Sequence, residues 1–189
     1  MKNVDINIVF AFLLFFTILI FELQIIGINN NISKLEIKQK NITNISVEDK
    51  FIDFIIEKYS QEYNIDKNLI KAISIVESGS KHYKNGSQDV KTSIGGAIGI
   101  MQLMPQTAKS MGVNPYSLDE NIKGAVKYLS YLDKKFNGDL DKIICAYNIG
   151  ESHVIKYGIP YGSMRYVNIV KKEKAKLDDK NIRAIRNSN

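Results

Sequence analysis

Apolar side chains recur at spacings of three and four residues through most of the chain after residue 47, and this is the period of an α-helix. The clearest segment runs from Asp119 to Phe136, where the apolar residues are Ile122, Ala125, Val126, Leu129 and Leu132. Pro105 stands where a short helix through about Met111 would begin, a position at which proline is tolerated. Because no stretch is typical of a strand, the sequence predicts an all-α domain.

One acid stands at the end of a predicted helix. Asp66 is a typical N-cap residue, and the helix after it has an apolar face that includes Ile70 and Ile73. Glu77 lies one turn beyond Ile73 on the same face, so it projects from the core-facing side. Gly79 then ends the helix. The sequence therefore places a carboxyl group beside apolar side chains at a helix end.

Further helices are predicted on both sides of this one. A helix begins near Ser46, and its apolar face is formed by Phe51, Ile52, Phe54, Ile55, Ile56 and Tyr59. A short apolar helix runs from Leu140 to Tyr147, where Asn148-Ile149-Gly150 turns the chain. The last helix begins at about Ser163 and continues into a basic tail.

An apolar run marks the N-terminus. The residues from Ile8 to Phe21 are apolar except for one threonine, and further apolar residues continue to Ile28, with Glu22 and Gln24 expected near one membrane interface. A run of this length predicts a transmembrane helix, since about 20 apolar residues cross a bilayer. Signal cleavage requires small residues at the last and third-last positions, whereas Gly27 is preceded two positions earlier by Ile25. We therefore expect an uncleaved anchor within residues 1–28, with secretion after cleavage as the alternative.

The chain carries a formal net charge of +6 at pH 7. This charge favours an anionic partner. Nucleic acid and an anionic cell wall are both such partners, and the charge alone does not distinguish them. The excess is concentrated near the C-terminus, where residues 177–189 are interpreted as a solvated basic tail. Residues 29–46 are interpreted as a polar spacer between the anchor and a domain at residues 47–176.

Metal and nucleophile chemistry have little support in the sequence. The chain has one cysteine, Cys145, and two histidines, and it contains no His-Glu-x-x-His motif. It has no Gly-x-Ser-x-Gly nucleophile elbow and no glycine loop ending in Lys-Ser or Lys-Thr. We therefore expect neither a metal nor a cofactor.

Four motifs follow one another along the chain: Glu77-Ser78, the run from Gly96 to Pro105, Ala146-Tyr147-Asn148, and Tyr166-Val167. Together they resemble the lytic transglycosylases of the goose-type lysozyme superfamily, in the branch named after the soluble lytic transglycosylase (SLT). The resemblance runs from about residue 66 to about residue 170. It implies a lysozyme-like helical fold and an enzyme that cleaves the glycan strands of bacterial peptidoglycan.

The resemblance also implies how a single acid acts. A carboxyl group protonates a glycosidic oxygen best when its pKa is raised toward neutrality, and burial raises it. Ordinary glycosidases use two carboxylates, but no acid besides Glu77 lies in a matching motif. In the family, the substrate's N-acetyl group stabilises the anomeric carbon, and the same acid then deprotonates the C6 hydroxyl. Glu77 is thus expected to cleave the MurNAc-β-1,4-GlcNAc bond without water, leaving 1,6-anhydro-MurNAc ends.

The same resemblance assigns supporting roles. It implies that Ser93 hydrogen-bonds the acid and that the hydroxyl of Tyr166 reaches toward it. The residues expected to bind substrate are Ser78, Met101, Gln102, Tyr147 and Asn148. A purely structural role stays open for three of these residues. Gln102 is also compatible with a polar amide in the core, and either tyrosine with a buried residue whose hydroxyl is hydrogen-bonded.

The chain departs from the family pattern at two places. The loop from Glu77 to Gly96 is longer than in common members, which suggests a polar flap that alters the substrate sites. Gly162-Ser163 stands where the family often has Glu-Thr, so a supporting carboxylate is absent from that position.

A hydrolytic muramidase of the same fold and a non-catalytic peptidoglycan-binding protein are the alternative functions. The expected partners are peptidoglycan and, through the anchor, the membrane, with the domain outside the cytoplasm and no nucleic acid. Biological role, endo or exo action and oligomeric state stay open.

Overall fold

The computed structural model describes the backbone of residues 6–188 and the side chains of residues 21–34, 47–183 and 186. The chain divides into two compact units, Met1–Phe51 and Ile52–Asn189. Between residues 6 and 188 the elements are seven α-helices, and the only strand-like pairs are three isolated bridges. This part of the chain confirms the predicted all-α class.

Helix α1 is assigned to Ile6–Tyr63 and includes residue 46. The expected helix start near Ser46 is therefore wrong. Residues 29–46 contain neither proline nor glycine, so a residue that favours helix caps does not force an end there. Among the side chains that are described, no helix has a stretch long and apolar enough to span a bilayer. The predicted anchor lies mostly outside those residues and stays a prediction.

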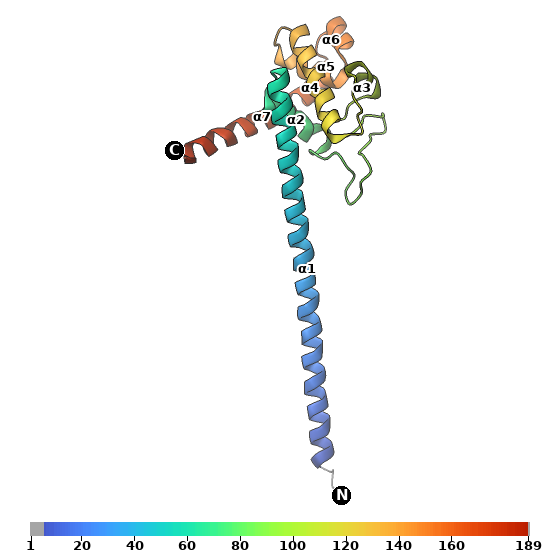
Figure 1. Cartoon of the computed structure of the whole chain (residues 1–189), viewed down its shortest axis with the longest axis vertical. Coiled ribbons are helices and arrows are strands. Elements are labelled where there is room, and N and C mark those ends of the chain that lie inside the picture. The colour runs from blue at the N-terminus through green and yellow to red at the C-terminus, as the bar shows by residue number, and fades with distance from the viewer. Residues whose placement is uncertain (1–5, 189) are drawn as a thin grey trace. The chain divides into compact units, whose positions relative to one another are not determined.

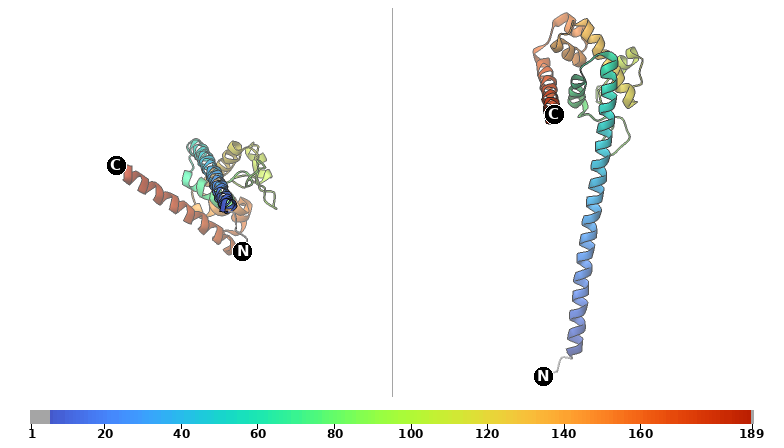
Figure 2. Two further views of the ribbon diagram at one scale, coloured as in Figure 1. Left: turned by 90° about the horizontal axis from the view of Figure 1, so that it is seen from below. Right: turned by 60° about the vertical axis from the view of Figure 1, so that its left-hand side comes forward.

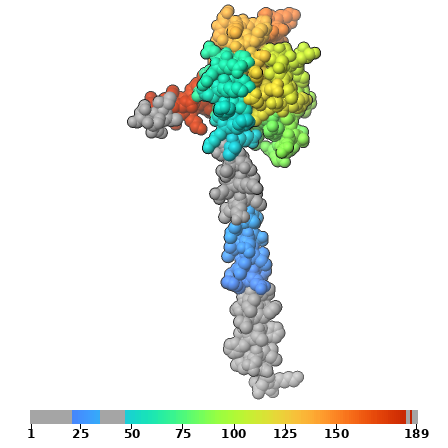
Figure 3. Space-filling view, viewed as in Figure 1, coloured from blue at the N-terminus to red at the C-terminus, as the bar shows by residue number. Residues whose placement is uncertain are grey.

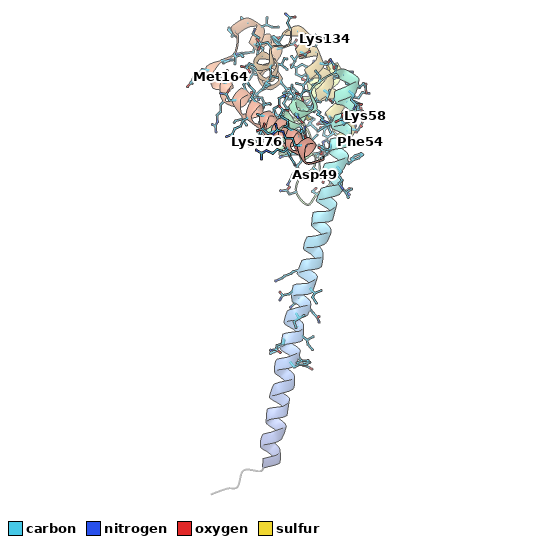
Figure 4. All side chains as sticks on the ribbon, turned by 90° about the vertical axis from the view of Figure 1, so that its left-hand side faces the viewer. Asp49, Phe54, Lys58, Lys134, Met164 and Lys176 are labelled. Atoms are coloured by element: carbon cyan, nitrogen blue, oxygen red, sulfur yellow. The ribbon has the colours of Figure 1, made fainter. Side chains whose placement is uncertain are left out.

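The last turns of α1 bury a narrower face than the sequence predicts. Ile52, Ile55, Ile56 and Tyr59 are buried at the spacings of one helical stripe. Phe51 and Phe54 are 52% and 66% exposed (Phe54 is labelled in Figure 4), so their assignment to the buried face is wrong. They lie on the neighbouring stripe, which hydrophobicity alone does not separate from the buried one.

Helix α2 (Lys67–Ser78) packs against α7 (Tyr161–Ser188), as Figures 1 and 2 show. Asp66 caps α2 by accepting a hydrogen bond from the amide of Asn68, as predicted. Two polar contacts join the helices. The Nζ of Lys174 lies 2.7 Å from the Oδ2 of Asp66, and the Nδ2 of Asn68 donates a hydrogen bond of 2.6 Å to the Oδ1 of Asp178. The contact between α2 and α7 therefore continues beyond residue 176.

The remaining helices are α3 (Pro105–Met111), α4 (Leu118–Lys135), α5 (Leu140–Ile149) and α6 (Glu151–Tyr157). Helix α4 contacts α3 and α5, and α5 contacts α6 and α7. The fully buried aliphatic residues at the centre of the domain include Ile70, Ile73, Ile122, Val126, Leu129 and Ile144. Helix α6 was not predicted, because it is short and buries only Val154.

A long loop connects α2 to α3. Its isolated bridges pair Tyr83 with Val90, Thr92 with Ile98, and Ile98 with Leu103. In the space-filling view the loop (light green) lies at the surface beside α4 (yellow) (Figure 3). The loop begins directly after Glu77 and Ser78, so its conformation bears on the surroundings of the acid.

Candidate active site

Glu77 occupies the last turn of α2, and the helix ends because Gly79 adopts a left-handed conformation with φ 70°. Few residues other than glycine take this conformation without strain. The Glu77 side chain is partly buried, and the hydroxyl of Tyr166 donates a hydrogen bond of 2.5 Å to its Oε1. Tyr166 comes from α7, so the packing of α7 on α2 brings the two side chains together.

Burial raises the pKa of the Glu77 carboxyl, and the hydrogen bond from Tyr166 lowers it by a smaller amount. The net shift is upward, so Glu77 holds its proton to a higher pH than an exposed glutamate does. Burial also raises the pKa of Tyr166, and the nearby charge of Glu77 adds to this effect. Tyr166 therefore remains a hydrogen-bond donor, and the pair can present a protonated carboxyl group.

Tyr147 of α5 lies near Glu77, and Tyr128 of α4 packs against Tyr147. The Tyr147 hydroxyl donates a hydrogen bond of 2.8 Å to the carbonyl of Met101, and burial raises its pKa well above the usual value, with a contribution from the charge of Glu77. The ring of Tyr128 lies 5.9 Å from that of Tyr147, measured between centroids. Burial raises the pKa of Tyr128 to about 12. Tyr128 was not among the predicted residues.

The turn from Ile98 to Gln102 passes next to the end of α2. Ser78 donates a hydrogen bond of 2.7 Å from its hydroxyl to the carbonyl of Ile100. Gln102 has a φ of 47°, and the Nε2 of its side chain donates a hydrogen bond of 2.8 Å to the carbonyl of Gly99. The Met101 side chain is fully buried, so it presents no surface to a ligand in this structure.

Ser93 and Asn148 are both exposed. The Ser93 hydroxyl accepts a hydrogen bond of 3.0 Å from the amide of Ala97. Among the described residues, no hydrogen bond joins Ser93 to Glu77. The structure therefore does not bring Ser93 to the acid, and the roles assigned to Ser93 and Asn148 stay predictions.

Other acids of the domain have partners of their own or lie at the surface. Asp119 accepts a hydrogen bond of 2.6 Å from Tyr59, and Asp89 is exposed in the long loop. Glu151 accepts hydrogen bonds from Tyr131 and Lys135 through its Oε1. Within the described side chains there is no group of three histidine, cysteine or acidic residues placed to hold a metal ion.

A hollow of about 650 Å³ opens between α3, α4 and the junction of α5 with α6. It is lined by Gln106, Thr107, Ser110, Met111, Tyr128, Tyr131, Ile149, Gly150, Glu151, Ser152 and His153. Tyr128 belongs both to this hollow and to the contact with Tyr147. The Oε2 of Glu151 is buried and has no hydrogen-bond partner among the described residues. The lining therefore combines aromatic faces with amide, hydroxyl and carboxylate groups.

Residues 54–166 match the model of the transglycosylase SLT domain family, and the chain belongs to that family. The match covers more than half of the chain and includes Glu77, the turn at Gln102, Tyr147 and Tyr166. A lysozyme-like helical fold is thereby established for the domain, as the sequence motifs implied.

Similar proteins come from phages and bacteria. The chain is 39% identical over 94 residues to a transglycosylase of Enterobacteria phage PRD1, which covers 48% of this chain and 32% of that protein. It is 32% identical over 123 residues to the membrane-bound lytic murein transglycosylase E of Buchnera aphidicola, covering 54% of this chain and 51% of the relative. The chain thus spans at most about half the length of these relatives.

Solved structures resemble the domain as well. The lytic transglycosylase Slt of Pseudomonas aeruginosa has a TM-score of 0.56 and 25% identity, covering 66% of this chain and 23% of that one. The 70 kDa soluble lytic transglycosylase of Escherichia coli has a TM-score of 0.57 and 24% identity, covering 64% of this chain and 23% of that one. At such identity the second comparison concerns the fold alone.

Proposed function

We propose that the chain is a peptidoglycan lytic transglycosylase that cleaves the MurNAc-β-1,4-GlcNAc bond and leaves 1,6-anhydro-MurNAc ends. Membership of the SLT family supports this function. The observation that carries it is Glu77, a partly buried carboxyl with a raised pKa at the end of α2, hydrogen-bonded by Tyr166. The raised pKa keeps the carboxyl protonated where an exposed glutamate would already be ionised, as a general acid requires.

In the proposed reaction, protonated Glu77 donates its proton to the glycosidic oxygen, and the bond from that oxygen to the anomeric carbon breaks. The substrate's N-acetyl group stabilises the anomeric carbon. The Glu77 carboxylate then takes the proton of the C6 hydroxyl while O6 bonds to the anomeric carbon, which closes the anhydro ring and restores the acid. Because Tyr166 binds Oε1, the proton is transferred through Oε2.

The glycan strand is proposed to run from Glu77 past Gln102 and Tyr147 toward the hollow beside Tyr128. Sugars are neutral and carry many hydroxyl groups, and a lining of aromatic and polar groups suits such a ligand. The N-terminal apolar run is proposed to hold the domain at the outer face of the cytoplasmic membrane. A relative named as membrane-bound is consistent with such an arrangement.

The substitution Glu77→Gln tests the function, because it preserves the size of the side chain and removes the proton donor. Release of soluble fragments from purified peptidoglycan should fall by at least about a hundredfold, the lower end of general-acid contributions. Binding of the variant to insoluble peptidoglycan should persist. Asp89→Asn, which changes an exposed acid of the adjacent loop, should leave release unchanged. Near-normal activity of Glu77→Gln together with an inactive Asp89→Asn would place the acid in the loop and exclude the proposed site.

A further inference from the structure

His82 is fully buried although the loop residues from Tyr83 to Asp89 are exposed. The length of this loop suggests a polar flap, in which a fully buried histidine is unexpected. A buried imidazole is costly unless both of its nitrogen atoms have hydrogen-bond partners. Its surroundings therefore indicate what holds the loop in place.

Both ring nitrogens of His82 contact backbone groups that are distant in sequence. Nδ1 accepts a hydrogen bond of 3.2 Å from the amide of Ile100, and Nε2 lies 3.0 Å from the carbonyl oxygen of Tyr116. An amide only donates and a carbonyl only accepts, so these partners assign the proton to Nε2 and leave Nδ1 as the acceptor. His82 is therefore held as one neutral tautomer between the loop, the Ile98–Gln102 turn and the segment before α4.

Asn121 of α4 binds the same turn from its other side. Its Oδ1 accepts a hydrogen bond of 3.0 Å from the amide of Met101, and its Nδ2 donates bonds of 2.8 Å to the carbonyls of Ile98 and Pro115. Asn121 is also fully buried. An added Cβ on Gly99 would lie 2.6 Å from both Asn121 Nδ2 and His82 Cε1, so glycine is required between the two side chains.

Every backbone N–H and C=O group of Ile100 and Met101 is thus hydrogen-bonded to a side chain. The amide of Ile100 is bound by His82 and its carbonyl by Ser78. The amide of Met101 is bound by Asn121 and its carbonyl by Tyr147. These four side chains come from the loop, α2, α4 and α5. Two successive residues whose backbone is fixed in this way have little freedom to shift relative to the end of α2 that carries Glu77.

We propose that His82 is a positioning residue, which holds the Ile98–Gln102 turn so that Gln102 faces the substrate at a fixed place relative to Glu77. The inference rests on the proposed function, because the turn matters only if substrate binds over it. Of the four side chains that bind the backbone of Ile100 and Met101, only that of His82 comes from the loop and not from a helix. The expected consequence is an effect on substrate binding through Ile100, separate from any effect on stability.

Two amide substitutions separate the bonds of His82. In His82→Asn the shorter side chain can place an oxygen near the position of Nδ1 and keep the acceptor for Ile100. In His82→Gln the longer side chain reaches the position of Nε2 and keeps a donor for Tyr116. Tyr83→Ala is the matched control, since Tyr83 packs edge-on against the His82 ring with centroids 4.9 Å apart and forms neither hydrogen bond.

The KM for peptide-free glycan strands should rise about tenfold in His82→Gln and stay within about threefold of the parent value in His82→Asn and Tyr83→Ala. A tenfold change corresponds to about 1.4 kcal/mol, which is within the range for the loss of one hydrogen bond. The kcat should change by less than about threefold in all of them. Equal KM increases in His82→Asn and His82→Gln, or none in either, would overturn the proposal even if both variants were less heat-stable.

Hydrogen exchange at the Ile100 amide gives a readout that does not depend on activity. Its protection should persist in His82→Asn and be lost in His82→Gln. If the parent protein releases no glycan fragments but this pattern of protection holds, the proposed function has failed and the positioning role in catalysis with it, while the hydrogen bond stands. If the parent protein is active and Ile100 stays protected in a folded His82→Gln, the positioning by His82 is wrong.

Discussion

Glu77 and Tyr166 illustrate how two opposing effects set one pKa. Burial raises the pKa of the carboxyl group, while the hydrogen bond donated by Tyr166 favours the charged form and lowers it. Burial is the larger effect. Glu77 therefore keeps its proton to a higher pH, and the hydrogen bond from Tyr166 to its Oε1 fixes the orientation of the carboxyl group.

The variant Tyr166→Phe should separate these effects. Without the hydrogen bond, burial alone acts on Glu77 and its pKa rises further. Activity declines as rising pH removes the proton from the acid, so the declining limb of the pH profile of kcat/KM should move to higher pH. At the optimum, activity should fall by about tenfold, corresponding to a hydrogen bond worth about 1–2 kcal/mol, and hence less than in Glu77→Gln. A limb that stays in place or moves to lower pH would contradict the assigned partnership.

The acid could be predicted from the sequence, whereas the residues that hold its surroundings could not. Glu77 follows the apolar stripe of Ile70 and Ile73 and precedes a helix-ending glycine, and both signals are local. The burial of His82 depends on contacts with Ile100 and Tyr116, which no spacing within the loop reveals. Asn121 offered one signal, because it lies one turn before Ala125 on the buried face of α4.

At the scale of elements, the loop between α2 and α3 depends on glycines for two different reasons. Gly96 and Gly99 both have positive φ, at 84° and 77°. A Cβ on Gly96 would meet nothing within 4 Å, whereas a Cβ on Gly99 would lie 2.6 Å from Asn121 and His82. The first position thus requires only the backbone conformation, and the second also requires the space.

Gly96→Ala and Gly99→Ala should therefore differ in stability. Gly96→Ala should lower the free energy of unfolding by about 1–2 kcal/mol, the cost of a left-handed backbone for a residue with a Cβ. Gly99→Ala should lower it by about 3 kcal/mol or more, because forced displacement of buried side chains adds about 1–3 kcal/mol. Denaturant unfolding followed by circular dichroism measures both. Equal losses would mean that His82 and Asn121 do not enclose Gly99 as tightly as the structure has it.

Helices with a periodic apolar face were predicted close to their observed bounds. Pro105–Met111 was predicted as such, and the expected helix from Asp119 to Phe136 is observed as Leu118–Lys135. One helix was missed and the start of another was wrong. Glu151–Tyr157 was missed because it buries a single side chain and has no apolar period. The helix expected to begin near Ser46 is part of α1, because residues 29–46 contain no proline or glycine to end it. The exposure of Phe54 shows that hydrophobicity alone does not define a buried face.

At the scale of the whole molecule, the apolar residues between positions 8 and 28 predict that the protein is attached to a membrane. We expect the full-length protein to remain with membranes after alkaline carbonate extraction, because an apolar helix of this length is stable in a bilayer. Replacing Leu13 and Leu14 by arginine should release it, since each arginine at the centre of the span costs about 2.5–3.5 kcal/mol. Recovery of a shortened protein from the culture medium would instead show that the segment is a cleaved signal.

The chemistry of the cut ends tests the proposed reaction most directly. We expect mass spectrometry of fragments released from purified peptidoglycan to show 1,6-anhydro-MurNAc ends, lighter by one water than reducing ends, and their release to depend on Glu77. The mass difference arises because the C6 hydroxyl of the sugar, rather than water, attacks the anomeric carbon. Reducing MurNAc ends would identify a hydrolytic muramidase on the same fold, and no release at all would leave a peptidoglycan-binding protein. Either result would contradict lytic transglycosylation by Glu77.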